Sequence, residues 1–414
     1  MNLSTPFLPN LTPLRGIAAM LTVIFHVDLF LGGGGNVLLK TADSLLISRL
    51  YLMVDFFFVL SGFIMCHVYG TWFASAVRRS DFGRFTIARL ARVYPLHLAM
   101  LLLTALIWAI SGAVGIPENL ILQTENSAYS FVTNLLLLQA MNLHGWFSWD
   151  HAAWSISTEW WMYMLFPFLV RPFGRLGSAG RVAVVLACFA GYVAITFWIN
   201  PLVRVSPSLQ VIFGPGPPPM SNTINVGFQY GFLRCLFGFV LGMMMQAGFR
   251  ESWGRAWLGS GYTLGLLALG LGVCMHLGLP DAVTVGFFPL IILAGAYGSA
   301  GIDRLFAHRA LQRLGDWSFS IYLVHQPLAF AIGSVLAYQT LGQPTAGGPP
   351  PRPDLLTGWL IGLTFVALTL LVASFTYRFI EVPARRALNA RFKKPAVPTE
   401  SPIYQPINQS LKTQ

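Results

Sequence analysis

The sequence is poor in charged residues and in cysteine. Only 10% of its 414 residues are charged, whereas 55% are hydrophobic. A soluble domain carries about a quarter charged residues, so this chain has too few charges to cover a soluble surface. The four cysteines lie in apolar runs and form no close pairs. Neither a disulfide framework nor a zinc site is therefore indicated, and we expect no bound metal.

Three common catalytic motifs are also missing. The chain has no Walker A loop, no Gly-x-Ser-x-Gly elbow and no His-Glu-x-x-His pattern. The chemistry of this protein must therefore come from residues outside these motifs.

Long apolar segments fill most of the chain. The run 131–141 is too short to cross a bilayer, and we expect it to be re-entrant or interfacial. The predicted fold class is all-α, a polytopic transmembrane bundle. We expect about ten spans, because each of the following is about as long as a bilayer requires: 14–31, 50–70, 93–112, 153–170, 182–199, 227–247, 258–279, 283–300, 317–339 and 356–377.

The basic residues are unevenly distributed between the predicted loops. With ten spans, most of the 26 Lys and Arg residues fall on one side, including five arginines in the loop 71–92. The positive-inside rule then places both termini in the cytoplasm. The net charge of +11 therefore reflects topology, and we expect no nucleic-acid partner. Residues 1–378 form one predicted integral-membrane domain, and 379–414 a basic, then polar cytoplasmic tail that becomes disordered toward its end.

Several spans contain ionisable residues, which are costly in a bilayer and indicate either function or an ion pair between helices. Arg15 and His26 are eleven residues apart, about 1100° of helix rotation, so they share one face of the first span. His26 fits a general base or a hydrogen-bonded core histidine. Arg15 fits a functional cation or a side chain that snorkels to lipid headgroups.

A second group of arginines precedes the third span. Arg89 and Arg92 are one helical turn apart, and Arg84 lies upstream of them. Guanidinium groups bind phosphates in a bidentate manner, so this group fits a phosphate clamp. It equally fits a cluster that binds lipid headgroups.

A polar stripe crosses the predicted span 153–170. Ser155, Glu159 and Tyr163 follow one another at intervals of four residues and therefore share one helix face. An acid at this position is difficult to explain by packing alone, so Glu159 is a candidate functional residue.

Two further spans carry isolated polar residues. Asp55 and Ser61 interrupt the apolar run 54–65, where helix packing is the alternative explanation. His325 lies close to one face with Tyr322, just before Pro327. A structural hydrogen bond would explain His325 equally well.

Taken together and in order, six segments resemble the acyltransferase 3 family, integral-membrane O-acyltransferases that act on bacterial surface polysaccharides. The resemblance extends from about Leu11 to Arg386. The family's Arg-x10-His motif falls on Arg15 and His26, and its Arg-x-x-Arg motif on Arg89 and Arg92. The segments are LRGIAAMLTVIFH, DFFFVLSGFIM, ARLARVYPLH, WSISTEWWMYMLFPFL, FSIYLVHQP and FIEVPARR.

The resemblance implies transfer of an acyl group, commonly acetyl, from cytoplasmic acyl-CoA to a sugar hydroxyl at the bacterial inner membrane. It implies no permanently bound cofactor. The implied partners are acyl-CoA (acetyl-CoA), a carbohydrate acceptor and membrane lipids. In the implied site His26 acts as base or acyl carrier, and Glu159 orients an imidazole or binds the sugar. The other implied roles are catalysis or CoA binding for Arg15, CoA-phosphate binding for Arg89, Arg92 and Arg84, and lining of the substrate path for Ser61, Tyr163, His325 and Asp55.

The sequence departs from one family architecture and leaves other functions open. Some members carry an additional extracytoplasmic esterase-like domain, and nothing after residue 378 could form one, so a two-domain relay here would need a separate extracytoplasmic transferase. The main alternative is a multi-span transporter or a flippase of a lipid-linked sugar. Another membrane acyltransferase class with one intramembrane histidine, or a structural scaffold, would also fit the composition.

Overall fold

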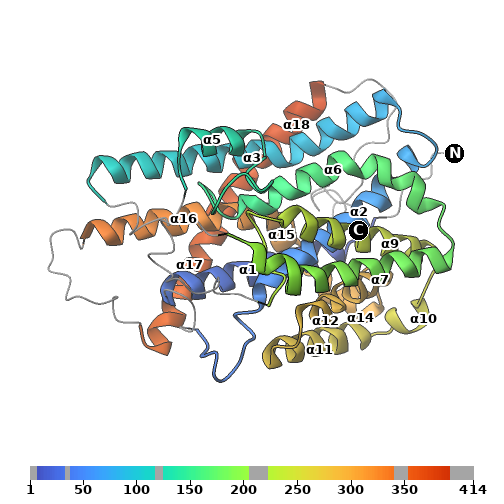
Figure 1. The fold of residues 1–414 in the computed structure, drawn as a ribbon. Helices are drawn as coiled ribbons and strands as arrows, with labels where there is room; N and C mark the ends of the chain where they lie inside the picture. Colours follow the sequence, from blue (N-terminus) through green and yellow to red (C-terminus); the bar gives the residue numbers. More distant parts are fainter. Residues whose placement is uncertain (1–6, 33–37, 117–124, 205–221, 340–352, 392–414) are drawn as a thin grey trace, which may run out of the picture.

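The computed structural model describes residues 7–32, 38–116, 125–204, 222–339 and 353–391. Regular structure in these ranges is helical, without a strand. Figure 1 shows the long helices side by side as one bundle. Among the helices that could cross a membrane, the most buried are α1 (Leu11–Gly32), α2 (Met53–Phe73) and α9 (Gly231–Arg250), which lie in its interior. The predicted all-α fold is thus confirmed for the described part of the chain.

The remaining helices surround these three. Short helices join the longer ones, and π turns lie at Ile195–Ile199 and Tyr377–Glu381. The longer surrounding helices are α3 (Arg79–Ala113), α6 (Ala153–Gly174), α7 (Ser178–Ala194), α11 (Thr263–Leu277), α13 (Phe287–Tyr297), α16 (Ser318–Gln339), α17 (Leu355–Thr376) and α18 (Val382–Arg391), and the shorter ones are α5 (Ala128–Leu135), α10 (Arg255–Leu258), α12 (Asp281–Val285), α14 (Ala300–Phe306) and α15 (Arg309–Asp316).

Fewer helices are long and apolar enough to cross a membrane than the ten spans that the sequence predicts. Among the described residues seven helices are long and apolar enough to cross a membrane, or eight if one bent pair counts as a single span. Helix α6 lies outside this set, and α11 has only 15 residues. Ten spans and cytoplasmic termini therefore remain predictions.

Two predicted boundaries are wrong. The segment 71–92 is not a loop, because α3 begins at Arg79 and continues through Pro95; a single proline can be accommodated in a long helix by a local adjustment. The segment 283–300 is not one helix, because Gly298 takes a left-handed φ of 66° and ends α13. Beyond residue 378 the helix continues through the π turn to Arg391, and residues 392–414 lie outside the described ranges.

The short apolar run 131–141 does not span the bundle. Helix α5 has eight residues and lies beside α3 (Figure 1). The Tyr94 hydroxyl and His97 Nε2 of α3 are 3.0 and 2.9 Å from the carbonyl oxygens of Leu135 and Asn134. These contacts fix the segment that leads from α3 into α6.

Helices α2 and α9 pack so closely that glycine is required at their contact. A Cβ at Gly62 would overlap the Phe239 carbonyl oxygen, and one at Gly242 would overlap the Val59 carbonyl oxygen. Small residues allow membrane helices to approach each other in this way. The serine–glycine pair at 61–62 in the sequence therefore marks a helix–helix contact.

Replacing Gly62 or Gly242 with alanine should lower the stability of the bundle by about 1–3 kcal/mol or more, because a backbone atom cannot move aside as a side chain can. Gly265→Ala in α11 is the matched control, since nothing lies within 4 Å of its added Cβ. Thermal unfolding in detergent measures the difference. Equal melting temperatures for all three variants would contradict the observed packing.

Candidate active site

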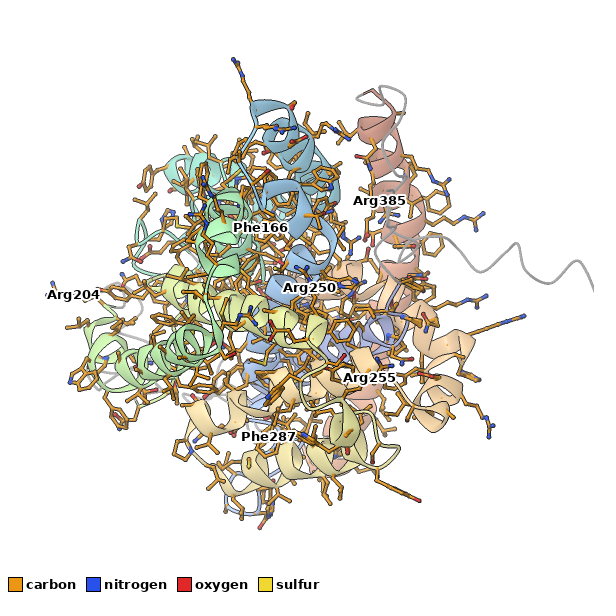
Figure 2. The ribbon with its side chains drawn as sticks, turned by 90° about the vertical axis from the view of Figure 1, so that its right-hand side faces the viewer. Phe166, Arg204, Arg250, Arg255, Phe287 and Arg385 are labelled. Carbon is orange, nitrogen blue, oxygen red and sulfur yellow. The ribbon has the colours of Figure 1, made fainter. Side chains whose placement is uncertain are left out.

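The bundle has one end rich in arginine. Figure 2 views this end, with Arg250 of α9, Arg255 of α10 and Arg385 of α18 labelled. The long helix α3 also begins here, at Arg79. This is the end that the sequence predicts to face the cytoplasm.

The centre of the candidate site is a pair of histidines on neighbouring helices. His26 of α1 and His325 of α16 have their ring centroids 4.7 Å apart. The Nδ1 atom of His26 lies 3.2 Å from Nε2 of His325 and 2.9 Å from the Thr22 carbonyl oxygen. Because a carbonyl oxygen can only accept, this bond assigns the proton of a neutral His26 to Nδ1. Nε2 of His26 then carries a lone pair, as a general base requires.

The start of α6 lies against α16 beside this pair. The backbone N–H of Ala152 donates to Gln326 Oε1 at 2.9 Å. The Ser155 hydroxyl is 2.7 Å from the Tyr322 hydroxyl. Figure 1 shows that α6 begins near the middle of the bundle rather than at an end. Polar side chains of α6 and α16 therefore meet in its interior.

The predicted polar stripe of α6 continues from this junction toward the arginine-rich end. The Tyr163 hydroxyl donates to Glu159 Oε1 at 2.5 Å and lies 3.2 Å from the Ser61 hydroxyl of α2. The guanidinium carbon of Arg89 lies 5.9 Å from the centre of the Tyr163 ring. Arg89 Nη2 also donates to the Tyr69 hydroxyl at 2.8 Å. The structure thus brings together four of the predicted site residues, from α2, α3 and α6.

The two arginines of the Arg-x-x-Arg motif have different surroundings. Arg92 forms an ion pair with Glu381, whose Oε2 also accepts from the Ser320 hydroxyl at 3.0 Å. Both side chains of the pair are largely buried. Arg89 instead contacts the two tyrosines described above. The ion pair of Arg92 fixes the π turn after α17 to α3 and α16.

Arg15 and Arg84 lie apart from the histidine pair. Arg15 Nη2 donates to the Gly315 carbonyl oxygen at 2.9 Å and so links α1 to α15. Arg84 lies 3.7 Å from Asp81 in the same helix and over the Trp72 ring. With 40% of its side chain exposed, Arg84 lies at the rim of the arginine-rich end.

Asp55 belongs to a separate buried ion pair. Its carboxylate accepts from Arg234 of α9 at 2.6 Å, and neither side chain is exposed. Arg234 also donates to Asn225 Oδ1 at 3.0 Å and to the Tyr51 carbonyl oxygen at 3.2 Å. This geometry links α2 to α9 and accounts for Asp55 without a substrate.

The sequence analysis missed Asp150 and His151, which directly precede α6. The His151 ring stacks on Phe147 at 5.3 Å and meets the edge of Phe330 at 5.3 Å. Burial, and secondly the neighbouring His26 ring, lower the pKa of His151 to about 3, so this imidazole is neutral at physiological pH. The sequence does contain a signal for this site, because an acid and a histidine stand next to each other just before the predicted span 153–170. It was missed because both residues were assigned to a loop.

No group of three or more His, Cys, Asp or Glu side chains in the described ranges could hold a metal ion. The site instead consists of imidazoles, hydroxyls, a carboxylate and an arginine inside an apolar helical bundle. Such an arrangement defines an integral-membrane protein with titratable groups suited to acid–base chemistry.

Comparison with known proteins identifies the family. Residues 9–378 match the family described as an acyltransferase domain. The chain therefore belongs to this acyltransferase family and is an acyltransferase, which confirms the resemblance found in the sequence.

Three relatives are similar to the chain over different lengths. It is 25% identical over 407 residues to "Acyltransferase MdmB" of Streptomyces mycarofaciens, covering 93% of each chain. It is 32% identical over 154 residues to "Protein 2 in picA locus" of Rhizobium radiobacter, covering 35% of this chain and 73% of that one. It is 22% identical over 407 residues to "Putative peptidoglycan O-acetyltransferase YrhL" of Bacillus subtilis (strain 168), covering 92% of this chain and 55% of that one. No solved structure matches the chain.

Proposed function

We propose that this integral-membrane acyltransferase moves an acyl group, specifically acetyl, from cytoplasmic acyl-CoA to a hydroxyl of a carbohydrate acceptor at the bacterial inner membrane. The observation that carries the proposal is the contact between His26 and His325 in the interior of the bundle. The printed names of two relatives, an acyltransferase and a peptidoglycan O-acetyltransferase, agree with this chemistry.

In the proposed reaction His26 acts as the general base. Its Nε2 takes the proton of the acceptor hydroxyl while the hydroxyl oxygen attacks the thioester carbonyl carbon. The carbon–sulfur bond then breaks, and the CoA thiolate leaves and takes the proton from the imidazolium. The products are the ester and free CoA, and His26 returns to its neutral form. The Thr22 carbonyl holds the His26 ring in this tautomer, and Nε2 of His325 contacts the same Nδ1 at 3.2 Å.

On the donor side, Arg89 is the arginine we assign to the phosphates of acyl-CoA. Its position between the arginine-rich end and Glu159 favours an anion that enters from that end. Arg15 and Arg84 extend the basic surface around it. Arg92 has a structural role in this proposal and does not bind the CoA phosphates, because Glu381 already neutralises its charge. Glu159 and Ser61 position Tyr163 along the path between Arg89 and the histidines.

The proposal is tested by acetyl-CoA binding and turnover in nanodiscs. Arg89→Gln should weaken acetyl-CoA binding by about 10-fold or more, because a charge-assisted bond to phosphate is lost. Arg92→Gln and Glu381→Gln should instead lower the melting temperature, since each leaves a buried charge without its partner. Arg309→Gln, at the exposed first residue of α15, is the control. Wild-type protein that neither binds nor hydrolyses any acyl-CoA would overturn the donor assignment and favour the transporter.

A further inference from the structure

Two polar atoms at the start of α6 have no hydrogen-bond partner in the described structure, and the proposed donor chemistry does not use them. Asp150 is only 2% exposed, and its Oδ1 accepts from the Ala152 N–H at 3.2 Å. Its Oδ2 is buried and has no hydrogen-bond partner among the described residues. Nε2 of His151 is buried and unpartnered in the same way.

An unpartnered carboxylate oxygen inside a bundle is costly, because it gives up its hydration without compensation. The local bond from the Ala152 N–H explains one oxygen of Asp150, but it does not require the second. The side-chain oxygen of an asparagine could accept the same bond. Burial of the second oxygen of Asp150 thus has a desolvation cost that its local structural role does not explain.

These atoms lie beside the histidine pair. The N–H of Ala152, the residue after His151, donates to Oε1 of Gln326 at 2.9 Å, and Gln326 directly follows His325. The Ser155 hydroxyl lies 2.7 Å from the hydroxyl of Tyr322, which is one helical turn before His325. A group bound by Asp150 and His151 would therefore lie next to the proposed base.

Aromatic rings enclose the same position. Phe147 stacks on His151, and its ring centroid lies 4.9 Å from that of Phe228, which in turn is 5.2 Å from Trp146. Phe330 of α16 meets His151 from another direction. Rings around a few polar groups are typical of small-molecule sites, where the polar groups orient the ligand.

The chain reaches this position from the end opposite the arginines. Helix α3 begins at the arginine-rich end and leads away from it, and the segment from Glu125 to Asp150 follows it back to the middle of the bundle. Phe228 likewise lies three residues before the start of α9, whose far end carries Arg250. Asp150 thus lies at the start of α6, whereas Arg89, where the donor is assigned, contacts Tyr163 about three turns further along this helix.

We propose that Asp150 and His151 form the acceptor subsite and bind hydroxyl groups of a carbohydrate-type polyol next to the hydroxyl that His26 deprotonates. This inference rests on the proposed acyltransferase function. The carboxylate Oδ2 accepts from one or two neighbouring hydroxyls, and His151 Nε2 hydrogen-bonds a further one. The rings of Phe147 and Phe330 pack against the apolar faces of the polyol.

The test uses n-octyl β-D-glucoside as the acceptor probe and acetyl-CoA as the donor, with the full-length protein in nanodiscs. Mass spectrometry measures acetylated glucoside, and release of CoA measures donor turnover. Asp150→Asn and His151→Gln are compared with Asp43→Asn, an exposed carboxylate with the same chemical change. Thermal unfolding of each variant separates a binding defect from misfolding.

We expect both site variants to raise the KM for the glucoside by about 10-fold or more, because each removes or weakens hydrogen bonds to hydroxyls, while their KM for acetyl-CoA changes less than about 2-fold. Asp43→Asn should match wild type in both. An unchanged glucoside KM in folded variants would overturn the subsite. Wild-type protein that turns over acetyl-CoA without acetylating the glucoside would also overturn it. If wild type neither binds nor turns over acetyl-CoA, the proposed function fails instead.

Discussion

Replacing His26 with glutamine should reduce acetyl transfer by about 10²–10⁴-fold, the range that general acid–base catalysis contributes, while acetyl-CoA still binds. Glutamine can occupy the space of the ring and hydrogen-bond to the Thr22 carbonyl oxygen, but it cannot accept a proton at neutral pH. CoA release with glucoside as acceptor measures transfer. Equilibrium binding of acetyl-CoA measures the donor site separately.

Two comparisons make this result specific. His325→Gln should lower transfer less than His26→Gln, because it removes only a side chain that contacts the His26 ring. His276→Gln is the control, since this histidine is exposed and its ring Nδ1 lies 2.8 Å from the Ser44 hydroxyl, away from the histidine pair. Wild-type transfer should fall as the pH is lowered and the base becomes protonated. A rate that does not fall at any acidic pH at which the protein stays folded would contradict a histidine base.

The sequence predicted the side chains of the site better than their contacts. Helix periodicity correctly placed Glu159 and Tyr163 on one face, and these two residues are hydrogen-bonded. The periodicity of one helix does not show which helix faces it, so the contact of His26 with His325, 299 residues later, could not be predicted. The Arg-x-x-Arg spacing likewise suggested one shared role, whereas Glu381, distant in the chain, pairs with Arg92.

The sequence also misjudged residues near the ends of spans. Asp150 and His151 looked like loop residues because apolar runs were expected to begin at the membrane surface, but α6 begins near the middle of the bundle. Residues 71–92 looked like a loop because they are basic, yet charge does not prevent a helix from continuing beyond the membrane. A hydropathy pattern locates apolar segments but does not give the depth at which a helix begins.

Asp55→Asn should destabilise the protein by about 3–5 kcal/mol, because it leaves Arg234 as a buried cation without a counter-ion. The substitution preserves the shape of the side chain, so lost packing contributes little. Chemical unfolding in mixed detergent micelles measures the free energy of unfolding. Asp281→Asn gives a comparison at another buried carboxylate, whose partner Arg49 is partly exposed. Water can hydrate Arg49 when the pair is broken, so this substitution should lower the free energy of unfolding by less.

A double variant separates a structural role of Asp55 from a role in the substrate path. Asp55→Leu combined with Arg234→Met removes both charges and should recover much of the lost stability, since apolar side chains of similar size often replace a buried ion pair without loss. If the pair is purely structural, the folded double variant also retains acetyl transfer. If Asp55→Asn instead has the same free energy of unfolding as wild type but loses acetyl transfer, Asp55 contacts the substrate. The 2.6 Å bond to Arg234 supports the structural role, because a carboxylate already neutralised by arginine offers little attraction to a passing substrate.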